Sequence, residues 1–91
     1  MIFGVFKISG HSMLPYFNPG ERIIVSNIPF SFRQPKVGEV VVFNYYNKIL
    51  VKRITKILDK KLFVAGDNKK DSLGIDSVES NDILGKVVFK F

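Results

Sequence analysis

The spacing of short β-rich runs and turn signals constrains the fold more than any other feature of this sequence. Val, Ile and Phe gather in short runs, and clusters of Gly, Pro, Asn and Asp separate these runs roughly every 8–12 residues. No stretch repeats apolar residues at helical spacing over several turns. The pattern predicts an all-β protein whose coiled antiparallel sheets form a small barrel. With 91 residues, the chain is expected to form a single domain over 1–91.

Turn signals bound each segment that carries the β pattern. The expected strands are 2–9, 22–26, 40–43, 49–57, 62–65 and 83–91. The polar segment 44–48 predicts a hairpin turn. The prolines in 27–36 favour a loop, and a long polar loop is expected over 66–81. Alternation along the last strand places Val87 and Phe89 on one face.

The composition excludes several classes of site. With no Cys and one His, the chain cannot form a disulfide scaffold, use thiol catalysis or build a Cys-based zinc site. The run Asp67-Asn68-Lys69-Lys70-Asp71 is similar to a calcium loop, but Lys69 occupies a ligand position and the twelfth place lacks Glu. No metal and no other cofactor is therefore expected.

The net charge of +6, from 14 basic and 8 acidic residues, is compatible with binding to nucleic acid, anionic lipid or an acidic substrate. However, the lysines are scattered, and the densest groups, 60–61 and 69–70, fall in predicted turns. They are interpreted as solvated loops, so nucleic acid is not an expected partner. A small basic β-barrel that stacks single-stranded nucleic acid on Tyr45 and Tyr46 remains an alternative function.

No membrane anchor is expected in this sequence. The longest apolar runs are far shorter than the ~20 residues that a transmembrane helix requires. The apolar start, 1–6, is too short for a signal-peptide core and lacks a preceding positive region. The chain is therefore expected to be soluble, with the cytoplasm favoured, or in peripheral contact with a membrane. No oligomeric state is predicted.

One serine lies in a stretch with a constrained backbone, 9–15 (SGHSMLP). Gly10 can adopt a positive φ without a Cβ penalty, while Pro15 fixes its own φ and pushes Leu14 toward an extended conformation. A serine hydroxyl becomes a strong nucleophile only when a base removes its proton. Ser12 is therefore a candidate nucleophile if a base lies beside it.

Lys52 is the best candidate for that base. Side chains alternate along a strand, so Lys52 shares one face with Leu50 and Ile54. Burial disfavours the ammonium form, and a lysine acts as a base near neutrality when its pKa falls from ~10.4 to roughly 7–8. The alternative is an edge-strand lysine that prevents aggregation. His11, the only histidine, would point away from Ser12 on an extended backbone and is a weaker candidate.

Three motifs in order resemble the type I signal peptidase family of serine proteases. They are a nucleophile motif (GHSMLP, 10–15), a strand pair that carries a base lysine (35–43 and 51–54) and a Gly-Asp-Asn loop (66–68, with Ser72 and Asp76-Ser77). The segment 85–87 after them resembles the closing strand of the family. One such motif alone would be weak support, whereas three in family order are specific.

The resemblance implies a signal-peptidase-like barrel and a Ser–Lys dyad. Ser12 would attack the scissile carbonyl, while neutral Lys52 would take its proton and pass it to the leaving amine. Ser72 would orient the Lys52 amine, and the backbone N–H of Ser12 would stabilise the oxyanion. The resemblance gives structural roles near the site to Gly10, Met13, Pro15, Arg53, Gly66, Asp67, Asn68 and Asp76.

The implied partner is an extended peptide segment of a protein substrate, with small side chains at the first and third positions before the cut. The implied activity is that of a serine endopeptidase that removes a short N-terminal leader or signal peptide. Because the anchor and accessory domain of many signal peptidases are not found, the chain is similar to the unanchored branch, which includes the maturation proteases of nickel-type superoxide dismutase. A self-cleaving-repressor-type peptidase domain is a second enzymatic alternative, although such domains lack the Gly-Asp-Asn loop.

Two positions depart from the family pattern. Gly10 stands where some members carry a serine that completes the oxyanion hole, so only backbone donors are assured. Val78 replaces the arginine that usually follows the Asp-Ser pair, which leaves Asp76 without its usual partner. The resemblance also implies that Asp67 forms an ion pair with Arg53.

Overall fold

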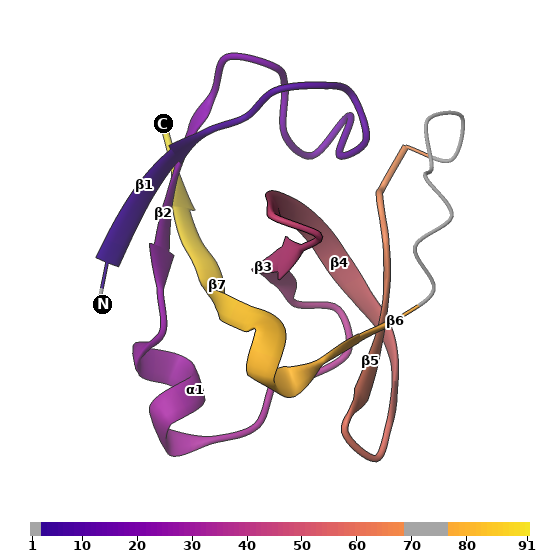
Figure 1. The fold of residues 1–91 in the computed structure, drawn as a ribbon. Helices are drawn as coiled ribbons and strands as arrows, with labels where there is room; N and C mark the ends of the chain where they lie inside the picture. The colour runs from indigo at the N-terminus through magenta and orange to yellow at the C-terminus, as the bar shows by residue number, and fades with distance from the viewer. Residues whose placement is uncertain (1–2, 69–76) are drawn as a thin grey trace.

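The structure is a computed structural model that describes residues 3–68 and 77–91. Within these residues, seven strands, one short α-helix and one 3₁₀ helix follow one another (Figure 1). They are β1 (Phe3–Lys7), β2 (Arg22–Ser26), α1 (Ile28–Phe32), β3 (Val40–Tyr45), β4 (Lys48–Leu58), β5 (Lys61–Ala65), β6 (Ser77–Glu79), η2 (Ser80–Asp82) and β7 (Ile83–Lys90).

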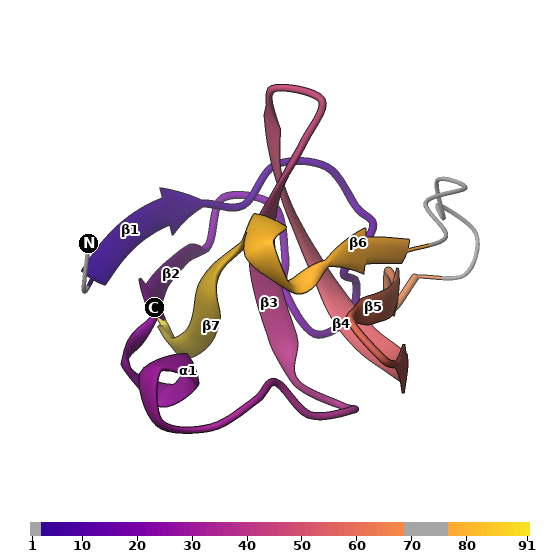
Figure 2. The same ribbon diagram turned by 60° about the horizontal axis from the view of Figure 1, so that its bottom comes forward.

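The strands form one antiparallel sheet in the order β1-β2-β7-β3-β4-β5-β6. The predicted all-β class with antiparallel pairing is therefore confirmed. The predicted barrel is wrong, because the described sheet is open, with β1 at one end and β6 at the other (Figure 2). β6 has 3 residues, all paired with β5, so it offers little length for a strand that would close the sheet.

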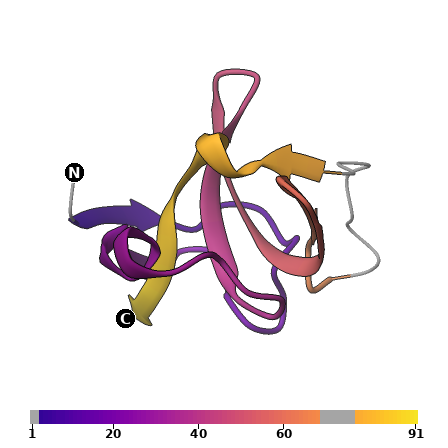
Figure 3. The same ribbon diagram turned by 90° about the horizontal axis from the view of Figure 1, so that it is seen from below.

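Strand β3 is the middle strand of the described sheet, and both of its faces are buried. It passes between the β1-β2-β7 part and the β4-β5-β6 part of the curved sheet, which is also visible from below (Figure 3). The first apolar cluster comprises Ile8, Met13, Phe17, Ile23, Val25, Val40 and Val42, and the second comprises Val41, Phe43, Ile54, Leu62, Val64 and Val78. A strand buried on both faces reads as a continuous apolar run, as VVVF does here.

A two-residue turn joins β3 to β4. Tyr45 pairs with Lys48, and between them Tyr46 and Asn47 have φ angles of 47° and 66°. Positive φ at both central residues is typical of a type I′ turn, whose twist matches that of the flanking strands. The predicted hairpin is thus confirmed, and its turn fixes the register between β3 and β4.

The loop predicted for 27–36 is wrong in part, because this segment contains helix α1. It has 5 residues, with Pro29 in its first turn. A helix of this length is too short to give a repeating apolar pattern, and it is held by packing of Phe30 against the second cluster. Among the described residues, no helix combines the length and apolar character needed to cross a bilayer.

The end of the long polar loop predicted for 66–81 also contains regular structure. β6 begins at Ser77, and η2 follows it directly. Val78, the central residue of β6, is 5% exposed and belongs to the second cluster. One apolar side chain among polar neighbours gives no strand pattern, so this short strand depends on its pairing with β5.

A bulge in β7 separates Val87 and Phe89, which were expected to share a face. Val25 pairs with Val87 and Ile24 with Phe89, so Val88 is an additional residue between the two pairs. An additional residue in one strand reverses the alternation of faces beyond it. Accordingly, Val87 packs against the first cluster, whereas Phe89 is 59% exposed. The expectation that these two side chains share a face is wrong.

A carboxylate connects the segment after α1 to the central sheet. Glu39 accepts hydrogen bonds from both terminal nitrogens of Arg33 and, at 2.7 Å, from the backbone N–H of Lys36. The Nζ of Lys86, on β7, lies 3.1 Å from the same carboxylate. These contacts, of which the Arg33 hydrogen bond is the strongest, lower the pKa of the Glu39 carboxyl from 4.5 to about 2.

We expect Glu39→Gln to lower the free energy of unfolding by about 1–3 kcal/mol at neutral pH, because hydrogen bonds to a charged group are lost. The pKa of Glu39 is lower in the folded state than in the unfolded state. Its contribution is therefore complete above about pH 5 and is lost as the pH falls toward about 2. Urea unfolding of both proteins at pH 7 and pH 3 measures the effect. An equal difference at the two pH values would contradict the assignment.

Candidate active site

Ser12 lies in the connection between β1 and β2, which arches over one end of the sheet (Figure 1). The N–H of Leu14 donates to the His11 carbonyl at 3.2 Å, and the N–H of Phe17 donates to the Met13 carbonyl at 3.0 Å. These bonds form consecutive turns, so the expected extended backbone around Ser12 is wrong. His11 is exposed and does not belong to the cavity that Ser12 lines.

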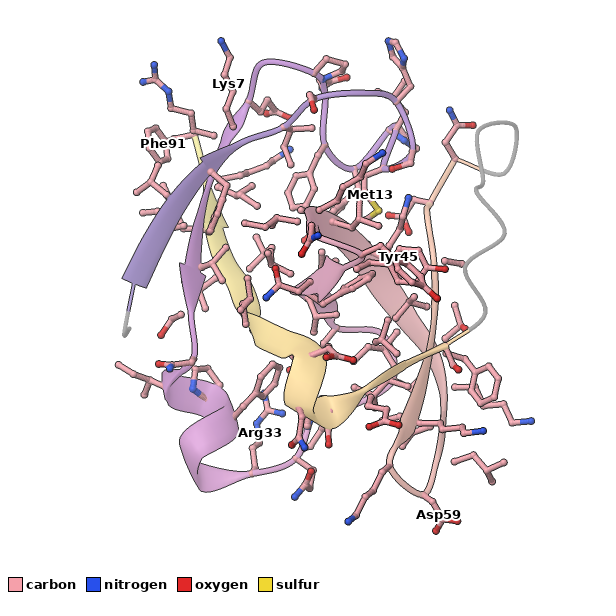
Figure 4. The ribbon with its side chains drawn as sticks, viewed as in Figure 1. Lys7, Met13, Arg33, Tyr45, Asp59 and Phe91 are labelled. Atoms are coloured by element: carbon pink, nitrogen blue, oxygen red, sulfur yellow. The ribbon has the colours of Figure 1, made fainter. Side chains whose placement is uncertain are left out.

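Two apolar side chains attach this connection to the sheet. Met13 is 3% exposed and Phe17 is 1% exposed, and both belong to the first cluster. Met13 points from the connection into the interior (Figure 4). Gly10 has a φ of 79°, in agreement with its predicted place in a bend, and the peptide bond before Pro15 is cis. The backbone of Ser12 therefore lies directly beside a residue that the core fixes.

The Gly-Asp-Asn loop contacts Ser12 from the other side. The backbone N–H of Asn68 donates to the Ser12 carbonyl at 2.8 Å, and its side-chain amide donates to the His11 carbonyl at 2.9 Å. Gly66 packs so closely that a Cβ at this position would collide with the Ser12 carbonyl oxygen and lie 3.2 Å from the Ser12 Cβ. Of the common residues, glycine alone fits this approach of two backbones.

Lys52 lies on β4 beside that contact. The pairing of β4 with β5 reaches Arg53 and Ala65, and Lys52 and Gly66 are the next residues along the chain from these two. Lys52 is 3% exposed and shares its face with Ile54, a member of the second cluster. The predicted burial of this lysine is confirmed. The alternative of an edge-strand lysine is wrong, because β4 pairs with β3 on one side and β5 on the other.

Ser12 and Lys52 line the same cavity, which has a volume of about 300 Å³. The rest of its wall is mainly apolar and comes from β1, the segment after it, and β4. These lining residues are Phe6, Lys7, Ile8, Ser9, Gly10, Met13, Ile49, Leu50 and Val51. Apolar walls with a few convergent polar groups are typical of binding sites for small ligands and peptide side chains.

Arg53 follows Lys52 on β4 and connects the strand to the Gly-Asp-Asn loop. Its guanidinium donates to the two carboxylate oxygens of Asp67 at 2.9 and 2.8 Å, and to the Gly38 carbonyl at 2.7 Å. The expected ion pair with Asp67 is therefore present. Its hydrogen bonds are the largest cause that raises the pKa of the Arg53 guanidinium. The guanidinium also lies 4.7 Å from the centre of the Tyr16 ring.

Some site residues were not identified from the sequence. Tyr16 lies in the turns after Ser12, where no pattern indicates that it will contact Arg53. By contrast, Phe6 and Ile8 are two residues apart on β1 and its extension, so they lie on the same face. The alternation of side chains could therefore have identified them as parts of one cavity wall.

The remaining expected residues are distributed as follows. Pro15 is exposed. Ser72 and Asp76 lie outside the described residues. Val78, which stands where the family has an arginine, is buried in the second cluster, and burial favours valine over an unpaired charge. Within 3–68 and 77–91, no group of three or more His, Cys, Asp or Glu side chains is arranged to hold a metal ion.

A known protein family matches the first part of the chain. No curated protein sequence matches the chain. The family described as "Signal peptidase, peptidase S26" matches residues 1–57, which include Ser12, Lys52 and Arg53 and make up more than half of the chain. The Gly-Asp-Asn loop lies beyond the matched part. With this match over more than half of its length, the chain belongs to the signal peptidase family of peptidases, peptidase S26.

Proposed function

We propose that this protein is a serine endopeptidase in which Ser12 and Lys52 form the catalytic dyad and remove a short N-terminal leader or signal peptide from a protein substrate. The observation that carries the proposal is the burial of Lys52, at 3% exposure, in the wall of the cavity that Ser12 also lines. Membership of a peptidase family makes peptide hydrolysis the relevant reaction for this pair.

Burial gives Lys52 the chemical character of a base. An ammonium group loses its hydration when it is buried, whereas the neutral amine loses much less, so burial favours the neutral form. The apolar neighbours Leu50 and Ile54, which share its face of β4, contribute to this environment. A neutral amine near a serine hydroxyl can accept the hydroxyl proton, and the same group can return the proton later in the reaction.

In the first half of the proposed reaction, Lys52 Nζ takes the proton from Ser12 Oγ while Oγ attacks the scissile carbonyl carbon. The tetrahedral intermediate then breaks its C–N bond, and the leaving amine takes the proton from the Lys52 ammonium. In the second half, Lys52 removes a proton from water, and the hydroxide attacks the ester between Ser12 and the substrate. The proton returns to Ser12 Oγ as the ester bond breaks.

The oxyanion needs a donor at the carbonyl that is attacked, and the backbone N–H of Ser12 is the proposed one. Within the described part of the chain this N–H donates no hydrogen bond to another protein group. Gly10 lies two residues before Ser12, and a Cβ at that position would meet no other atom within 4 Å, so the space beside Gly10 is open. Ser72 is the proposed group that orients the Lys52 amine.

The proposed substrate is an extended segment with small side chains at the first and third positions before the cut. The cavity of about 300 Å³ is compatible with small side chains. Ser9 and Gly10 are exposed and line it, so they offer backbone groups beside which an extended peptide can lie. A role like that of the nickel-type superoxide dismutase maturation proteases is the specific form of this proposal.

We expect both Ser12→Ala and Lys52→Met to reduce peptide cleavage by at least about 10³-fold, because each removes a member of the dyad. Ser80→Ala and Lys48→Met are matched controls, since Ser80 lies on η2 and does not line the cavity, and Lys48 is exposed on the same strand as Lys52. Both controls should retain cleavage. The assay follows peptide hydrolysis by mass spectrometry, with circular dichroism to check folding. Full activity in either folded dyad variant would remove the proposed mechanism.

The pH dependence of kcat/KM should also show that the Lys52 amine is desolvated. We expect kcat/KM to rise with pH along a limb centred below about pH 9, rather than near the ordinary value of ~10.4 for a solvated lysine. A rise occurs because the base must be unprotonated to act. Initial rates between pH 5 and pH 11 measure the limb. A limb near pH 10.4 would show that the base is hydrated.

Gly66→Ala should reduce cleavage strongly, because the new Cβ collides with the Ser12 carbonyl oxygen and displaces the serine from the lysine. The matched control is Gly20→Ala, where a Cβ meets no other atom within 4 Å although φ is +93°. We expect the first variant to lose about 10²-fold or more in kcat/KM. Gly20→Ala should keep its kcat/KM and lose only stability. Equal activity in the two variants would contradict this role for the close contact.

A further inference from the structure

Two positive side chains lie opposite each other on β1 and β2, and one of them lines the cavity. Lys7, the last residue of β1, is exposed and lines the cavity. The register of the sheet places Arg22, the first residue of β2, directly opposite Lys7, and Arg22 is exposed as well. Like charges directly opposite each other repel, so the pair is unfavourable unless a negative group approaches it.

The acidic residue nearest to the pair in sequence is engaged elsewhere. Glu21 accepts a hydrogen bond from the Asn18 N–H at 2.6 Å, and its carboxylate lies 3.6 Å from Lys90 Nζ. None of the ion pairs among the described residues involves Lys7 or Arg22. Lys7 is therefore available to a negative group that comes from outside the chain, whereas the backbone of Arg22 pairs with that of Phe91.

We propose that the site prefers peptide substrates with an Asp or Glu side chain near the scissile bond, and that Lys7 selects this side chain, with Arg22 adding to the positive field. The inference rests on the proposed peptidase function. The described cavity wall contains no acidic residue, and of its two lysines Lys7 is exposed while Lys52 is the proposed neutral base. An acidic substrate side chain would therefore be attracted by Lys7 and repelled by no carboxylate at this wall.

The position of the acidic residue follows from the geometry of the cavity. Lys7 and Ser12 line the same cavity, so one short extended segment can contact both. Five extended residues span at most ~17 Å, which places the acidic side chain within about five residues of the bond that is cut. A bilayer surface with anionic lipid is the other negative partner for this pair, but the shared cavity wall favours the peptide.

The test uses a peptide that the wild-type protein cleaves in a Ser12-dependent manner, found in a digest-derived peptide library. Versions of this peptide carry Glu or Gln at each of the five positions on either side of the bond. For the wild type, we expect kcat/KM to be about two- to fivefold higher for Glu than for Gln at one position, as is typical of an exposed ion pair. Lys7→Glu should lower this ratio below one.

The ratio separates selection from a general electrostatic effect. Changing the charge of Lys7 also alters the field at Lys52, but that change affects the Glu and Gln peptides alike. The matched control is Lys60→Glu, which makes the same charge change beside Asp59, at the end of the molecule opposite Lys7 (Figure 4). The control should keep the wild-type ratio.

The outcomes distinguish the two proposals. Ser12-dependent cleavage with equal rates for Glu and Gln at every position would overturn the selection by Lys7 and leave the peptidase proposal intact. A ratio that changes equally in Lys7→Glu and Lys60→Glu would also overturn it. If Lys7→Glu loses binding to phosphatidylserine vesicles while the ratio stays unchanged, the pair serves a membrane surface instead. The absence of Ser12-dependent cleavage in the library would overturn both proposals.

Discussion

The contact of the Gly66 backbone with the Ser12 backbone is the constraint on which the rest of the site depends. The contact lies at the point where the connection after β1 meets the end of β5, and two hydrogen bonds from Asn68 maintain it. Gly66 follows Ala65, whose pairing with Arg53 attaches the end of β5 to β4 one residue from Lys52. Backbone contacts therefore connect the segment of Ser12 to the strand of Lys52.

The central strand explains how so short a chain can bury a lysine. β3 contributes apolar side chains to both clusters, so a single strand supports two small cores, one on each face. β4 lies beside it and is covered on its other edge by β5. Lys52 thus occupies an interior strand next to Val41, which is 0% exposed, and the same packing that stabilises the sheet excludes water from the amine.

The features that could be predicted are those with a local or periodic cause. The burial of Lys52 followed from the period of two along β4, and the hairpin followed from its turn residues. The Val88 bulge, the short β6 and the open sheet could not be predicted, because each depends on pairing between distant strands. In the site, family resemblance pointed to Gly66, whereas the contact of Tyr16 with Arg53 arises only in the folded chain.

The hydrogen bond between Asn68 and His11 joins residues 57 positions apart in the chain. During synthesis, the segment that carries the serine leaves the ribosome well before the segment that contacts it, so the two parts meet only when most of the sheet has formed. A nascent chain therefore lacks the contact between the Gly-Asp-Asn loop and the segment of Ser12. Under the proposed function, a copy of the protein would gain its dyad only after this loop has docked.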